Sequence, residues 1–115
     1  MIIDWQRVSI YVRPGWTDMR KEINGLAVLV GEELTCEPLS GDLYLFCNRR
    51  RTHLKVLYWD KSGFALWLKR LEKAKFPWPE GEARARQITF EELRMLLEGI
   101  DFWHAHQSLQ YSITK

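Results

Sequence analysis

The residues of this sequence that could do chemistry are basic side chains interleaved with aromatic rings, concentrated between residues 48 and 79. Nine Lys and Arg lie between residues 49 and 75 against two acids, so this stretch carries +7 in a chain whose total is +2. Cations beside flat rings are typical of a surface that binds nucleic acid. The predicted contact residues are Arg49, Arg50, Arg51, Lys55, Lys69, Arg70, Lys73 and Lys75.

Two tryptophans of the same stretch, Trp59 and Trp67, are candidates to stack on exposed bases, at about 1–3 kcal/mol for each base. Two other uses of these residues stay open. The cations can form a solvated edge that discourages sheet aggregation, while the Trp rings lie in the core. They can also form a face that docks an acidic protein partner.

The acidic and nucleophilic side chains do not form a catalytic pattern. Asp4, Asp18 and Asp60 lack the spacing of metal ligands, and Asp60 is better explained as the residue that opens a turn. There is no glycine-rich phosphate loop, and no nucleophile has a partner at a recognisable spacing. We therefore expect a protein that is not an enzyme, with no metal and no cofactor.

The bulk properties predict one soluble domain. A chain of 115 residues buries roughly two thirds of the surface that its unfolded form exposes, so it needs no metal or disulfide to fold. The N-terminal stretch carries a charge where a secretory signal needs an apolar region. The longest apolar run, residues 26–30, is far shorter than the ~20 residues that cross a bilayer. We expect a cytoplasmic protein without a membrane partner.

The elements that must position the basic residues follow from local patterns. A first helix is expected over 18–34, capped by Thr17 or Asp18, and a second over 90–98, opened by a Thr89–Glu92 capping box and ended at Gly99. Strands are expected at 8–13, 43–47, 54–59 and 64–70, with a short one from Gln87.

These elements predict an α+β fold with a mainly antiparallel sheet of about four to five strands and two helices. Residues 1–103 form the single domain, and 104–115 form a C-terminal tail. Along 54–59 the residues pointing to each face of the sheet are mostly apolar, so the sheet needs two covers. Either the two helices supply both covers, or a second subunit supplies one, which leaves a homo-oligomer open.

Four stretches of the sequence resemble the TnpB accessory proteins of the insertion sequence 66 family of bacterial transposons. They are TDMRKEINGLAVLV at 17–30, EPLSGDLYLFCNRRR at 37–51, LKVLYWDKSGFALWLKRLEKAKFPWP at 54–79 and LLEGID at 96–101. They stand in the family's order and cover most of residues 8–103. The resemblance implies a small protein that is encoded beside a transposase and needed for full transposition, unrelated to the RNA-guided nucleases that share the label.

The residues and the resemblance together predict an accessory factor for transposition of a bacterial insertion sequence. It is expected to bind DNA at the ends of the element, or the transposase, or both. The alternative is a protein-only adaptor or dimer module that has no contact with DNA. The segment TDMR at 17–20 is shared with the family, but its residue types favour a structural role over a catalytic one.

Overall fold

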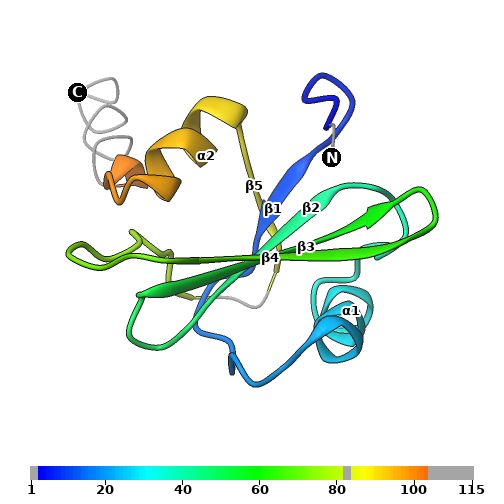
Figure 1. The fold of residues 1–115 in the computed structure, drawn as a ribbon, viewed down its shortest axis with the longest axis horizontal. Helices are drawn as coiled ribbons and strands as arrows, with labels where there is room; N and C mark the ends of the chain where they lie inside the picture. Colours follow the sequence, from blue (N-terminus) through cyan, green and yellow to red (C-terminus); the bar gives the residue numbers. More distant parts are fainter. Residues whose placement is uncertain (1–2, 82–83, 104–115) are drawn as a thin grey trace.

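The computed structural model describes residues 3–81 and 84–103, which form one sheet with a helix on either side (Figure 1). The elements in chain order are β1 (Ile10–Val12), α1 (Ile23–Glu32), β2 (Leu43–Cys47), β3 (His53–Asp60), β4 (Gly63–Arg70), β5 (Arg86–Ile88) and α2 (Phe90–Leu97). The strands lie in the order β4-β3-β2-β1-β5. The predicted α+β class with a mainly antiparallel sheet is confirmed, and the predicted tail lies outside the described residues.

The sheet carries an apolar core on each face, and each helix covers one of them (Figure 1). On one face, Leu54 and Val56 of β3 pack with Leu93 and Leu96 of α2. On the other, Leu57 of β3 joins a second cluster with residues of α1. The alternation expected along β3 is confirmed, and the two helices supply both covers.

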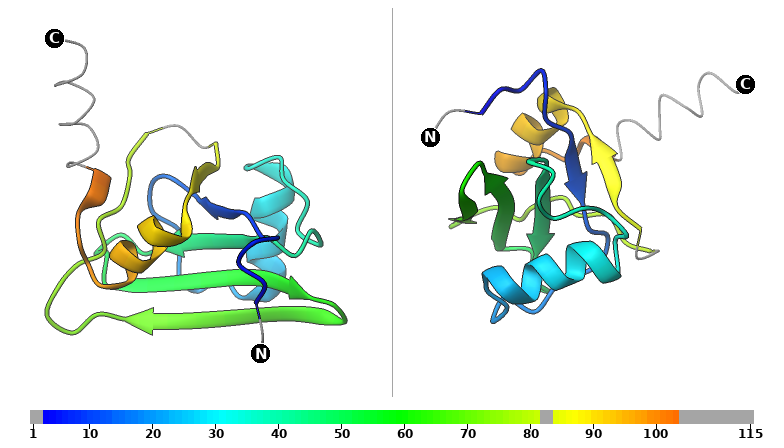
Figure 2. Two further views of the ribbon diagram at one scale, coloured as in Figure 1. Left: turned by 90° about the horizontal axis from the view of Figure 1, so that it is seen from above. Right: turned by 90° about the vertical axis from the view of Figure 1, so that its right-hand side faces the viewer.

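The pairing of β1 with β2 is the exception to the mainly antiparallel sheet. These two strands are parallel, with Ile10 opposite Leu43, whereas the other neighbouring pairs are antiparallel. Parallel neighbours cannot be joined by a tight turn, because the chain must return to the same end of the sheet. Helix α1 provides this return, which explains why it lies across one face of the sheet (Figure 2).

The first helix is shorter than predicted, and the proposed caps are wrong. It begins at Ile23 instead of residue 18, and its capping residue, Glu22, makes no side-chain capping bond. The buried Thr17 hydroxyl accepts a hydrogen bond from Arg13, and its amide donates to the Cys47 carbonyl. Asp18 instead binds the guanidinium of Arg20, and these hydrogen bonds lower the pKa of Asp18 to about 2. Contacts with the loop and sheet have therefore replaced the local capping pattern.

Most of the remaining boundaries agree closely with those predicted. Strand β2 has the predicted limits, β3 gains one residue at each end and β4 gains Gly63, whereas β1 is shorter than the predicted 8–13. The Thr89–Glu92 capping box is present in both directions, and Gly99 follows α2 with a φ of 79°. A Cβ at Gly99 would lie 3.3 Å from the Lys75 carbonyl oxygen, so the end of α2 packs closely on the segment after β4.

Candidate nucleic-acid interface

One end of the sheet gathers three segments that are far apart in the sequence: residues 13–22 after β1, 48–52 between β2 and β3, and 69–81 at and after the end of β4. We call these segments the basic end. The last two lie at the same end of the sheet in Figure 1, because the antiparallel pairing places Arg70 opposite His53. The β3–β4 turn, which contains Lys61, lies at the opposite end.

Backbone hydrogen bonds join the three segments into one unit. The Leu71 amide donates to the Thr52 carbonyl at 2.9 Å, and the Phe76 amide donates to the Arg51 carbonyl at 2.8 Å. The first segment is joined in the same way, since the Gly15 amide donates to the Pro79 carbonyl at 2.9 Å. The basic end is therefore a defined surface and not a set of independent loops.

The loop 48–52 has a fixed conformation. The Asn48 side-chain oxygen accepts hydrogen bonds from the amides of Thr52, at 2.9 Å, and His53, at 3.0 Å. Arg51 adopts the left-handed backbone conformation, with a φ of 64°. Arg49 and Arg50 are exposed at the turn of this loop, where neighbouring guanidinium groups can meet a phosphate backbone.

Seven of the eight predicted contact residues lie at the basic end. Five of these have no carboxylate partner among the described residues: Arg49, Arg50, Lys69, Lys73 and Lys75. Arg51 pairs with Glu80, and Arg70 pairs with Glu72 at 2.7 Å. The Arg70 pair is well exposed and so contributes little stability, which leaves its cation available to an anionic ligand.

Lys55, the eighth residue, does not belong to this surface, and its prediction as a contact residue is wrong. Its side chain points to the α1 face of β3 and the residue is only 6% exposed. Its ammonium donates to the carbonyls of Met19 and Lys21, both at 2.9 Å, and to the Glu22 carboxylate at 3.2 Å. Lys55 joins the sheet to the segment that leads into α1.

Replacing Lys55 by Met is expected to lower the free energy of unfolding by about 2–3 kcal/mol, because the part-buried bonds to the Met19 and Lys21 carbonyls lose their donor. Chemical unfolding followed by circular dichroism measures this. The folded variant should bind nucleic acid within about twofold of the unmodified protein, since Lys55 reaches no ligand at the surface. A large loss of binding in a stable Lys55→Met protein would contradict this assignment.

The two tryptophans predicted to stack on bases lie outside the three segments of the basic end. Trp59 is half-buried next to the β3–β4 turn, with its ring edge-on to Phe64 at 5.1 Å between centroids. Trp67 is 42% exposed but lies on the α2 face, beside an apolar cavity of about 210 Å³ that Trp5 and Val56 also line. Neither ring belongs to the three segments of the basic end.

A third tryptophan, which the sequence analysis did not single out, lies at the basic end. Trp16 is 56% exposed, and the guanidinium carbon of Arg49 lies 6.0 Å from the centroid of its ring. Its position follows from the turn at Pro14 and Gly15, which ends the strand expected at 8–13. A large aromatic residue directly after such a turn is the signal that would have identified it.

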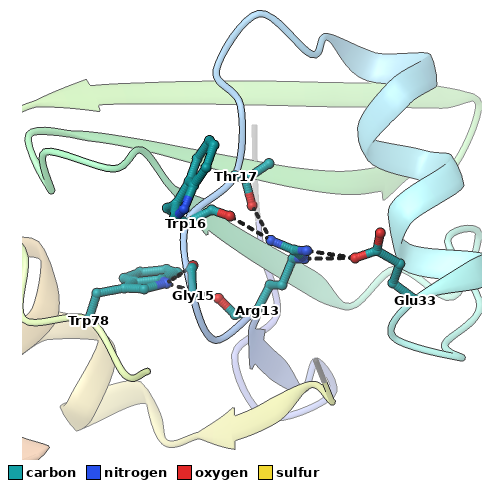
Figure 3. Close-up of polar contacts among 6 residues, drawn as sticks. All are labelled: Arg13, Gly15, Trp16, Thr17, Glu33 and Trp78. Atoms are coloured by element: carbon teal, nitrogen blue, oxygen red, sulfur yellow. Dashed lines mark hydrogen bonds and ion pairs between the residues drawn. The ribbon is translucent and has the colours of Figure 1, made fainter. Parts of the chain in front are cut away.

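The backbone of this Trp16 loop is held by a polar network centred on Arg13 (Figure 3). The Arg13 guanidinium donates to the Trp16 carbonyl at 2.8 Å and to the Thr17 hydroxyl at 3.0 Å, and it also pairs with Glu33. The indole N–H of Trp78 donates to the carbonyls of Arg13 and Gly15, both at 2.9 Å. The expected structural role of the TDMR segment agrees with these contacts.

The acidic side chains weighed as nuclease ligands are dispersed over the described part of the chain. Asp4 and Asp18 bind the nearby Arg7 and Arg20, and Asp60 ends β3 at a turn. Within residues 3–81 and 84–103, no three His, Cys, Asp or Glu are grouped to hold a metal ion. Over the same residues, no helix has the length and apolar character needed to cross a membrane.

Comparison with known proteins connects this arrangement to a family. The model of the family described as IS66 Orf2-like protein matches residues 8–107. Two similar proteins come from Sinorhizobium fredii: y4hO, 38% identical over 94% of both chains, and y4jC, 36% identical over 84% of this chain and 80% of its own. Both are described as uncharacterized, and no solved structure matches the chain. The chain therefore belongs to the IS66 Orf2-like family of accessory proteins associated with the transposition of insertion sequences.

Proposed function

We propose that this protein is a non-catalytic accessory factor that binds DNA at the ends of its insertion sequence through the basic end. The observation that carries the proposal is the grouping of cations at one end of the sheet. Arg49 and Arg50 come from one segment, and Lys69, Lys73 and Lys75 come from another, yet backbone hydrogen bonds hold the two segments together. None of the five has a carboxylate partner among the described residues.

The proposed contact is electrostatic and made mainly to phosphates. Each phosphate that a Lys or Arg neutralises releases condensed counterions, and the affinity then falls as salt is added. Phosphate contacts position a protein on a duplex without reading its sequence. The proposed role is therefore to hold the ends of the element while another protein cuts them.

The rival function, a protein-only adaptor, is favoured by a different feature of the fold. Strand β4 is the outer strand of the sheet, with eight residues, and it exposes Trp67 and Leu68. An unpaired edge with exposed apolar side chains is a surface to which another protein can add a strand. The basic end could equally dock an acidic patch of the transposase, which makes direct measurement of DNA binding the deciding test.

A salt titration of duplex binding distinguishes the two functions. If five phosphates are contacted, the affinity for a duplex carrying the terminal sequence of the element should fall about 500-fold between 50 and 200 mM salt. Fluorescence anisotropy of a labelled duplex measures this fall. Absence of binding, or binding that salt does not weaken, would contradict the DNA function and leave the adaptor as the better account.

A further inference from the structure

Trp16 is the most exposed aromatic residue of the described surface, and it lies at the basic end beside Arg49. Exposing an indole ring to water forgoes the stabilisation that burial of so large a side chain would give. The exposure is not the result of a loose loop. The carbonyl of Trp16 and the amides of Gly15 and Thr17 are all hydrogen-bonded to other parts of the fold.

The chemistry around the ring indicates what it can bind. The guanidinium of Arg49 lies by the ring and has no carboxylate partner among the described residues, while Arg50, the next residue, is also exposed. An aromatic plane beside cations is the combination by which proteins hold single strands: the ring stacks on a base and the cations meet the backbone. A base inside a duplex has both faces covered by its neighbours and cannot use such a ring.

We propose that Trp16, with Arg49 and Arg50, forms a binding site for an unpaired base of single-stranded DNA. The base stacks on the indole ring of Trp16, and the adjoining phosphates meet the two guanidinium groups. The site is tolerant of sequence, because every base presents a flat face. The inference rests on the proposed DNA-binding function and adds that the basic end prefers single-stranded DNA. Such a strand is present at a duplex end that has opened or been cut.

The test compares two labelled oligonucleotides of about 12 nucleotides, a length within the range bound by single-strand sites. One is oligothymidine, and the other has the same phosphates but abasic sugars. The unmodified protein should bind oligothymidine about 5- to 150-fold more tightly, the factor expected for one stacked base. Equal affinity for the two would overturn the inference without the need for any variant.

A Trp16→Ala variant identifies the ring responsible. It should bind the two oligonucleotides equally, whereas its affinity for a duplex should stay within about twofold, since the cations remain. Trp16→Phe keeps a smaller flat ring and should recover part of the preference. Trp67→Ala removes a similarly exposed tryptophan from the α2 face and is the matched control, with an unchanged preference expected.

The outcomes separate this inference from the proposed function. If Trp16→Ala keeps the preference for oligothymidine while duplex binding still falls with salt, the stacking site is wrong and the DNA-binding function stands. If the unmodified protein binds neither single strand nor duplex, the proposed function is wrong and the inference falls with it.

Discussion

Replacing both Arg49 and Arg50 by Glu is expected to lower the affinity for duplex DNA by about 10- to 100-fold at 0.1 M salt, because two phosphate contacts are lost. The same change should make the slope of log affinity against log salt shallower by about two. Both side chains are exposed at the turn of a loop whose shape depends on Asn48. The substitutions should therefore leave the fold intact, and anisotropy titrations at several salt concentrations measure both effects.

A matched control keeps the total charge change the same but moves it elsewhere. Lys61→Glu with Arg94→Glu places the two substitutions in the β3–β4 turn and on the exposed face of α2, outside the three segments of the basic end. This control should bind duplex within about threefold of the unmodified protein, because neither side chain belongs to the proposed contact surface and exposed charges are screened by salt. An equal loss in both double variants would mean that net charge, not the basic end, determines the affinity.

The same pair of variants separates DNA from protein as the direct partner. If Arg49→Glu/Arg50→Glu leaves the affinity for DNA intact but abolishes capture of the transposase of the element, the adaptor function is correct. If DNA affinity falls as expected and capture of the transposase is retained, the basic end is a DNA surface.

Trp78→Ala is expected to lower the free energy of unfolding by about 3–5 kcal/mol, the usual cost of removing a large buried aromatic side chain. Trp78 is 5% exposed, and its indole N–H donates to two carbonyls of the loop that presents Trp16. Trp78→Phe keeps a ring but removes the donor, so we expect a smaller loss of about 1–3 kcal/mol. Urea unfolding followed by far-ultraviolet circular dichroism measures both values.

Trp16→Ala is the control for this prediction, because its side chain is mostly exposed and its removal should cost no more than about 0.5 kcal/mol. The two tryptophans have different roles. Trp78 joins segment 69–81 to the loop of residues 13–17 by hydrogen bonds, whereas the Trp16 side chain of that loop is exposed to solvent. A Trp78→Ala protein as stable as the unmodified one would show that the basic end does not depend on this link.

The parts of the fold that were predicted correctly depend on local patterns. The Thr89–Glu92 capping box satisfies free amides within one helical turn, and the turn at Asp60–Gly63 joins adjacent strands. Neither needs any distant residue. The start of α1 could not be predicted in this way, because Thr17 is used by Arg13, whose own position depends on the loop after β1. The parallel pairing of β1 and β2 likewise depends on partners more than thirty residues apart.

The candidate site shows the same limit. Seven of the eight contact residues predicted from charge density lie at one end of the sheet, because the hairpins bring residues 48–52 and 69–75 together. Charge density gave the wrong role for Lys55. Its side chain points to the α1 face, where its ammonium donates to the carbonyls of residues 19 and 21. Charge density also missed Trp16, whose place beside Arg49 depends on contacts between distant segments, such as the hydrogen bond between Thr17 and Cys47.

The central claim is that the basic end is the working surface of this protein in transposition. The most direct test is the transposition frequency in bacteria of an element whose own copy of this protein carries Arg49→Glu and Arg50→Glu. The frequency should fall to that of an element lacking the protein, while Lys61→Glu with Arg94→Glu should transpose at the unmodified frequency. Normal transposition with Arg49→Glu/Arg50→Glu, at a normal cellular level of the protein, would contradict the claim.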